Sequence, residues 1–262
     1  MLYVLDMHDN GMGVTTAATV KLSSILSSLS YALDLTEGHP RGHTSRSCPI
    51  GMRIARALGL PAEDQSDLFY ALLLKDAGCS SNSARVFQLF GGDDQVAKRG
   101  VWMRDWRKLR EQIAYVLDYA EPEGKFLERF RRLAVLAAKG PAARRMLFEV
   151  RCDRGADIAR TLGFSQPTAM AIRCMDEHWD GGGYPDGLRR DRIPVLARIV
   201  GLAQVAEIFA SEKNPSSAAH VARQRRGSWF DPEVVDAFLG VCGEEELWEA
   251  CASTTSPPRS PG

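Results

Sequence analysis

Apolar residues recur at intervals of three and four along most of this chain, which is the spacing of one face of an α-helix. The first such stripe begins at Leu22 and ends before Gly38. Further stripes occupy residues 50–58, 126–137, 199–206 and 235–239. No segment shows the alternation of a half-buried strand, and the chain contains no internal repeat. The pattern therefore predicts an all-α fold.

One segment, from about residue 62 to residue 77, is predicted to be the central buried helix. Apolar side chains surround residues 68–74 almost completely, which leaves no face for water. Lys75 and Asp76 stand at its C-terminal end, and Gly78 suits the position just beyond a helix. Charged groups at the end of a buried helix need a partner or water, so both residues are notable for structure or for chemistry.

Polar residues followed by proline mark several helix starts. Ser165 predicts an N-cap with Pro167 in the first turn, and later helices are expected to begin at Pro194 and after Asp231. The helix that begins at Ser165 is expected to run as far as Gly181. Three consecutive glycines there permit positive φ and close backbone approach, and should stop it.

These elements predict one helical domain over residues 19–250. Residues 1–18 show weak periodicity and are predicted to be a flexible N-terminus. The stretch of about 93–150 is expected to be a helical insertion that covers or lines a cleft. The stretch 251–262 is rich in serine, threonine and proline and is predicted to be a disordered tail.

Composition narrows the classes of function. The 33 basic and 33 acidic residues balance, and the basic run Arg223–Arg226 is expected to be a solvated face, so no nucleic-acid partner is predicted. No stretch approaches the roughly 20 apolar residues of a membrane helix, and the N-terminus lacks the order of a signal peptide. The six cysteines form no CxxC pair, which favours reduced thiols. We therefore expect a cytoplasmic protein with no membrane partner.

A loop signature, WDGGGYPDGL, begins at Trp179 and is the most distinctive stretch of the chain. Pro185 fixes its own φ, and Trp179 and Tyr184 bracket the turn with aromatic rings. This pattern predicts an ordered loop near a cleft, and the alternative is a stiff corner between two helices. Glu177 and His178, just before the loop, are interpreted as polar surface.

This loop and the run RIPVLARIV that follows it resemble the signature of HD-GYP domains, a branch of the HD metal-dependent phosphohydrolase superfamily. The triplet is intact as Gly183, Tyr184 and Pro185, and the resemblance extends from about Leu26 to Leu239. The family is associated with hydrolysis of cyclic di-GMP in bacteria. The resemblance therefore implies an HD-GYP-like multi-helix domain in bacterial signalling. It also suggests that degenerate copies can sit beside an intact HD-GYP domain or an output domain in longer proteins.

An HD-type phosphohydrolase holds two or three divalent metals with His and Asp side chains, and the metals activate a water molecule. At the ligand positions that the resemblance implies, His43 and Asp76 match the family. The other family positions are occupied by Lys75 (for the His of the HD pair), Cys79 (for the Lys after it), Arg151 (for a later His), Met175 and Asp176 (for a double His) and Gln204 (for a late Asp).

These replacements put cations where metals would sit. We expect an ion-paired, metal-free cleft in which Lys75 or Arg151 neutralises a carboxylate, with Lys75 at its edge. His43, Asp76, Arg151, Asp176 and Gln204 should gather around this cleft. An arginine in such a place can also bind a phosphate through its planar fork. The ligand-binding candidates are Arg46, Arg151, Gly183, Tyr184 and Pro185.

Three hypotheses follow for function. The first is a bacterial signalling or regulatory module with a degenerate metal site and no cofactor, which binds a cyclic dinucleotide or a signalling protein. The second is an iron- or manganese-dependent phosphodiesterase whose reduced metal site is built from His43, Asp76 and Asp176, with help from Glu177 or Glu207. Asp76 and Lys75 are the catalytic candidates if the protein is an enzyme. The third is a dimerisation scaffold, in which the chain forms a homodimer.

Overall fold

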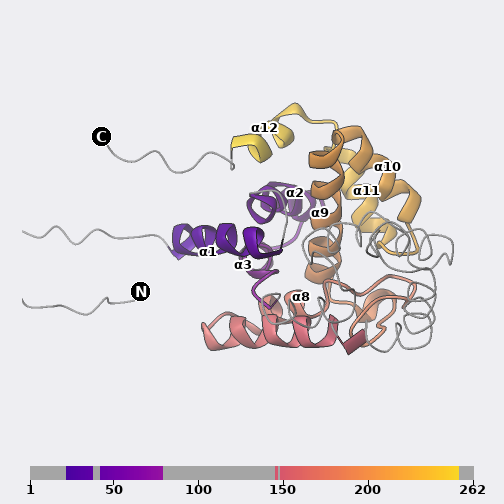
Figure 1. The fold of residues 1–262 in the computed structure, drawn as a ribbon. Coiled ribbons are helices and arrows are strands. Elements are labelled where there is room, and N and C mark those ends of the chain that lie inside the picture. The colour runs from indigo at the N-terminus through magenta and orange to yellow at the C-terminus, as the bar shows by residue number, and fades with distance from the viewer. Residues whose placement is uncertain (1–21, 38–41, 79–144, 147, 254–262) are drawn as a thin grey trace, which may run out of the picture.

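The computed structural model describes residues 22–37, 42–78, 145–146 and 148–253. In these ranges the structure is helical, without a strand, and confirms the all-α prediction (Figure 1). A further helix, without a label in the figure, occupies residues 148–161. The labelled elements are α1 (Leu22–Glu37), α2 (His43–Ala57), α3 (Ala62–Leu74), α8 (Gln166–Arg173), the 3-10 turn η2 (Arg190–Arg192), α9 (Val195–Glu212), α10 (Pro215–Arg225), α11 (Pro232–Val241) and α12 (Glu245–Ser253).

Helix α9 is the central element of the described bundle. It packs against α2, α3, α8, α10 and α11 (Figure 1), and residues 196–208 along it are buried, apart from half-buried Arg198. The prediction that 62–77 forms the central helix is therefore wrong in part. Helix α3 ends at Leu74, and its first turn is exposed because Glu63 and Asp64 belong to it. Its buried half, from Leu68 onward, joins the core beneath α9.

The helix starts predicted from proline and polar residues are confirmed. Ser165 caps α8 by accepting a hydrogen bond from the Thr168 amide at 3.1 Å. Asp231 caps α11 in the same way, through the Glu233 amide at 2.9 Å. Pro194 occupies the N-cap position of α9. These caps set where α8 and α9 begin, on either side of the glycine-rich loop.

The helix before this loop ends earlier than the sequence predicted. Helix α8 ends at Arg173, and turns follow at residues 174–176, well before Gly181. The turn that follows packs closely on α9, since a Cβ placed on Gly201 of α9 would lie 2.7 Å from the Met175 carbonyl oxygen. The helix thus ends before the glycine triplet, and the chain continues in a turn that lies against α9.

Part of the predicted domain organisation lies outside the described residues. The structure does not describe the predicted N-terminal segment 1–18, most of the predicted insertion 93–150, or residues 254–262 of the predicted tail. Helix α12 extends to Ser253 and buries Cys251, so the first three residues of the predicted 251–262 tail are helical. None of the described helices has the length and apolar character needed to cross a membrane.

Candidate functional site

The first part of the candidate site joins the start of α2 to α9. Glu207 is buried on α9, where its carboxylate contacts His43 Nδ1 and accepts a hydrogen bond from Arg46 Nε at 2.5 Å. The Ser211 hydroxyl donates a further bond at 2.5 Å. Burial raises the pKa of Glu207, but His43 and Arg46 outweigh burial and lower the pKa to about 2. Glu207 is therefore held as a carboxylate between the two side chains of α2.

The second part follows the end of α3. Lys75 Nζ contacts Asp76 Oδ2, and the Lys75 side chain has an exposed fraction of 0%. The sequence predicted Lys75 at the edge of a cleft. This prediction is wrong, because the side chain is buried. Burial among Leu73, Leu74 and their neighbours excludes it from solvent, because the whole segment continues the apolar core of α3. The expected pairing of a cation with the Asp76 carboxylate is confirmed.

Thr44 joins Asp76 to a second buried carboxyl group on α1. Its Oγ1 lies 3.1 Å from Asp76 Oδ2 and 2.7 Å from Asp34 Oδ1. A hydroxyl has one proton, so it donates to one of these oxygens at a time. Burial raises the pKa of Asp34, although Lys75 and Thr44 oppose the rise.

The third part is an ion pair beside the glycine-rich loop. Arg151, on the helix of residues 148–161, directs Nη2 to Asp176 Oδ2. The Cys152 thiol donates to the same oxygen at 3.4 Å. Asp176 is 4% exposed, and the Arg151 guanidinium carbon lies 5.3 Å from the centroid of the Phe148 ring. The ion pair between Arg151 and a site carboxylate, which the sequence predicted, is confirmed.

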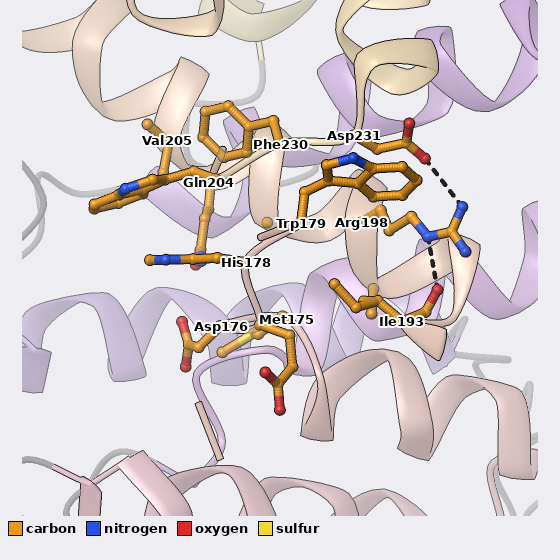
Figure 2. A pocket seen from close by; sticks show the side chains of 14 residues that line it. Met175, Asp176, His178, Trp179, Ile193, Arg198, Gln204, Val205, Phe230 and Asp231 are labelled. Carbon is orange, nitrogen blue, oxygen red and sulfur yellow. Dashed lines mark hydrogen bonds and ion pairs between the residues drawn. The ribbon is translucent and has the colours of Figure 1, made fainter. Parts of the chain in front are cut away.

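These parts are neighbours in space. Asp176 and Gln204 line one cavity (Figure 2), and Gln204 precedes Glu207 by one turn of α9. On the other side, Gly78 packs so closely on the Arg151 backbone that a Cβ would collide with its carbonyl oxygen. The three parts are thus connected through α2, α3 and α9, which pack on one another.

The cavity between the loop and α9 is small. Its enclosed volume is about 20 Å³, which is room for about one water molecule. Arg198 lies along one wall (Figure 2), where it donates to Asp231 at 3.0 Å and to the Ile193 carbonyl at 2.6 Å. Its guanidinium carbon lies 5.2 Å from the centroid of the Trp179 ring. These contacts fix the first aromatic residue of the loop against α9.

An aromatic and cationic stack closes the other side of this cavity. His178 stacks on Trp229 at 4.2 Å, and the Arg225 guanidinium carbon lies 3.9 Å from the Trp229 ring centroid. Two groups cannot share one ring face at these distances, so they cover opposite faces. Arg225 is only 7% exposed, so the prediction of a solvated face is correct for the exposed Arg223 and Arg226 but wrong for Arg225.

The glycine-rich loop is held through its backbone by Glu177. The Glu177 carboxylate accepts hydrogen bonds from the amides of Asp186 at 2.7 Å, Gly187 at 3.1 Å and Leu188 at 2.9 Å. Glu177 is 6% exposed, and burial raises its pKa while these three amides lower it. The interpretation of Glu177 as polar surface is therefore wrong, because its carboxylate serves as the acceptor for three loop amides.

The triplet that carries the family resemblance packs tightly. A Cβ on Gly183 would collide with the backbone of residues 176–178, so this position requires glycine for close approach rather than for its φ. Gly181, in contrast, has a φ of +81°. The Tyr184 ring stacks on Phe148 at 4.8 Å with an interplanar angle of 9°. Tyr184 thereby brings the loop against the helix that carries Arg151.

The metal candidates have charged or polar partners within the protein. Lys75 forms an ion pair with Asp76 Oδ2, and Arg151 forms one with Asp176 Oδ2. Glu207 contacts one nitrogen of the His43 ring. Within the part of the chain that the structure describes, no group of three or more His, Cys, Asp or Glu side chains is arranged to hold a metal. Cys79, the remaining residue at a family position, lies outside the described residues.

Comparison with known proteins identifies the class. A family model described as an HD domain matches residues 141–234. The 3'3'-cGAMP-specific phosphodiesterase 3 of Vibrio cholerae is 40% identical over 218 residues, which cover 83% of this chain and 47% of that protein. The cyclic di-GMP phosphodiesterase response regulator RpfG of Xanthomonas campestris is 34% identical over 105 residues, or 38% of this chain and 27% of that protein.

A solved structure agrees with these matches. The crystal structure of a cyclic GMP-AMP-specific phosphodiesterase from V. cholerae superimposes with a TM-score of 0.65 and 33% sequence identity, over 90% of this chain and 54% of that one. The chain therefore contains an HD domain and belongs to the HD-GYP family, as its loop signature predicts. It spans about half the length of the V. cholerae relative and of the solved structure.

Proposed function

We propose that this chain is a regulatory HD-GYP domain that binds a cyclic dinucleotide and does not hydrolyse it. The observation that carries this proposal is the pairing of Lys75 with Asp76 and of Arg151 with Asp176. Each carboxylate that could serve as a metal ligand already has a cation of the chain on one oxygen. A divalent metal would have to displace that cation or bind beside it, and both are unfavourable.

The ligand class follows from relatives and from the cations of the site. Two relatives are named as phosphodiesterases of 3'3'-cGAMP and of cyclic di-GMP. In this chain the side chains of Arg46 and Arg151 are 12% and 14% exposed, whereas Lys75 is wholly buried. A guanidinium has five N–H donors, enough to hold a carboxylate and a phosphate at once. We therefore assign phosphate recognition to Arg46 and Arg151.

The cavity itself is not the proposed nucleotide site. An enclosed volume of about 20 Å³ is far below that of a nucleotide, so the ligand must approach the arginines from the solvent side. Tyr184 of the loop stacks on Phe148, whose ring also lies 5.3 Å from the Arg151 guanidinium carbon. In this proposal the loop residues Gly183, Tyr184 and Pro185 form a rigid wall beside the bound phosphate.

The test measures binding and turnover in the same preparation. Cyclic di-GMP and 3'3'-cGAMP are titrated into the full chain by calorimetry, with the linear dinucleotide as a competitor control. Hydrolysis is then followed with added manganese or iron. We expect saturable binding without turnover, and binding weakened at least about tenfold in Arg46→Gln. Arg226→Gln, which removes an exposed arginine far along the sequence, is the matched control. Absence of binding, or binding that Arg46→Gln leaves unchanged, would refute the proposal.

The alternative function is a phosphodiesterase with a reduced metal site at His43, Asp76 and Asp176. The names of the relatives favour it, and it keeps Asp76 and Lys75 as catalytic candidates. It requires iron or manganese to enter the site and displace the two cations. Metal-dependent turnover that Asp76→Ala abolishes would establish this alternative and remove the regulatory proposal.

A further inference from the structure

The exposed large apolar side chains of the described residues concentrate on one helix. Leu22, Ile25, Leu29 and Tyr31 of α1 are 42%, 54%, 43% and 40% exposed. Elsewhere in the described residues, the exposed large apolar side chains are Met146 and Leu162. Single exposed apolar residues are ordinary, but several on one helix face mark an interaction surface.

Three of the four exposed large apolar side chains on α1 form a regular seam. Leu22, Ile25 and Leu29 are separated by three and four residues, and exposed Ala32 continues the series after three more. This is the spacing of the apolar positions where two helices pack at a shallow angle. Tyr31 follows Leu29 by two residues, about 200° around the helix, and so lies outside the seam.

A neighbouring face of α1 is anchored to the domain. Leu26, Ser30 and Asp34 are buried at intervals of four residues. The Ser30 hydroxyl donates to the Leu73 carbonyl at 2.5 Å, and Asp34 accepts from Thr44. Helix α1 packs on α2 and α3 and lies at one side of the bundle (Figure 1). Its exposed apolar seam is therefore held in a fixed direction relative to the bundle.

The lack of charged side chains around this seam indicates what kind of partner can cover it. Residues 22–33 contain no charged side chain, and serine fills most of the positions between the apolar residues. A strongly charged partner would find no complementary group there. A second copy of the same helix would bring no like charges together, and small serines allow two helices to approach closely.

We propose that the seam formed by Leu22, Ile25, Leu29 and Ala32 is a homodimerisation surface, on which α1 packs against α1 of a second copy around a two-fold axis. Such an interface is isologous, so each seam residue meets the seam of the partner. One helix per subunit buries less area than a standard protein interface. The dimer is therefore a weak one, with a dissociation constant in the micromolar range.

Analytical ultracentrifugation of the full chain over a range of concentrations tests this surface. We expect a reversible monomer–dimer equilibrium. Ile25→Glu should raise the dissociation constant at least about tenfold, because the two-fold axis brings the two new charges together. Ile25→Glu with Leu29→Glu should leave only monomer. Tyr31→Glu, on the same helix but outside the seam, is the matched control and should dimerise as the unaltered chain does. Circular dichroism checks that each variant keeps its helices.

Three results would overturn the proposal. The first is an unaltered chain that stays monomeric at every concentration. The second is a dimer that both seam variants leave intact, which would place the interface elsewhere. The third is a dimer weakened as much by Tyr31→Glu as by Ile25→Glu. None of these results depends on nucleotide binding, so the test is separate from that of the proposed function.

Discussion

Two regions of this domain lie side by side and differ in how they keep the family pattern. The glycine-rich loop retains the triplet Gly183, Tyr184 and Pro185, and its backbone amides bind the Glu177 carboxylate. Beside it, the carboxylates of Asp76 and Asp176 pair with the cations Lys75 and Arg151. The loop is satisfied by the protein itself, so its shape does not depend on a metal. A fold can therefore preserve the loop while the neighbouring chemistry changes.

These two ion pairs show how a buried carboxylate is stabilised within the protein. A carboxylate without a metal still needs a positive partner, because an isolated buried charge is costly. Lys75 and Arg151 provide that partner for Asp76 and Asp176. On this interpretation the cations are structural first, and removing one of them should be more harmful than altering the loop.

Lys75→Met gives the largest expected effect on stability. Removing the ammonium leaves Asp76 buried and unpaired, and breaking such a pair costs about 3–5 kcal/mol in free energy of unfolding. Urea denaturation of the variant and of the unaltered chain measures the difference. The control is Lys75→Met combined with Asp76→Leu, which removes both charges and should recover most of the loss. A cost under about 1 kcal/mol for the single variant would contradict the buried ion pair.

The acid dependence of stability should come largely from Glu207. Its pKa is lowered to about 2 from an ordinary value of 4.5, so the folded state binds fewer protons than the unfolded state between these values. Its contribution is complete above about pH 4.5 and is lost as pH falls toward 2. A shift of this size corresponds to about 3 kcal/mol. Denaturation at a series of pH values should show this loss in the unaltered chain, and Glu207→Gln should flatten it. An unchanged slope in Glu207→Gln would assign the effect to other groups.

The loop should respond less, and locally. Glu177→Ala removes the acceptor of three amides and should cost about 1–3 kcal/mol. Hydrogen exchange should then accelerate at Asp186, Gly187 and Leu188 more than in α9. Glu149→Ala changes an exposed carboxylate on the neighbouring helix and is the matched control. Equal acceleration throughout the domain would mean that Glu177 supports the whole fold rather than the loop.

How far the sequence predicts this structure depends on the kind of signal. Helical periodicity and caps such as Ser165 and Asp231 predicted the helices correctly, because these signals are local. The loop signature predicted the family, which the similar proteins confirm. The end of α8 was mispredicted, and the turn that follows it packs on Gly201 of α9, a residue distant in sequence that local signals do not reveal.

The candidate site was predictable only in part for the same reason. The carry-over from the family identified Asp76 and Asp176, but neither Asp34 nor Thr44 belongs to the family pattern. A local signal for Asp34 did exist, since it follows Leu26 and Ser30 at intervals of four on the buried side of α1. The role of Glu177 had no such signal, because its three partners are backbone amides whose positions depend on the folded loop. The roles assigned to the site residues stay predictions until binding is measured.

The smallest expected effect is that of restoring one family residue. Met175→His returns one histidine of the double-histidine position, and we expect no gain in bound iron or manganese and no turnover of cyclic di-GMP. Ligands of one metal act as a unit, and in this variant Lys75 and Arg151 still hold the carboxylates. Elemental analysis of the purified variant, beside the unaltered chain, measures the metal content. The informative contrast is a variant with Lys75→His, Arg151→His, Met175→His, Asp176→His and Gln204→Asp together, which removes both cations and restores the ligands. Stoichiometric metal in the single variant would show that the two ion pairs yield readily to a metal, and the comparison between loop and metal positions would then lose its physical basis.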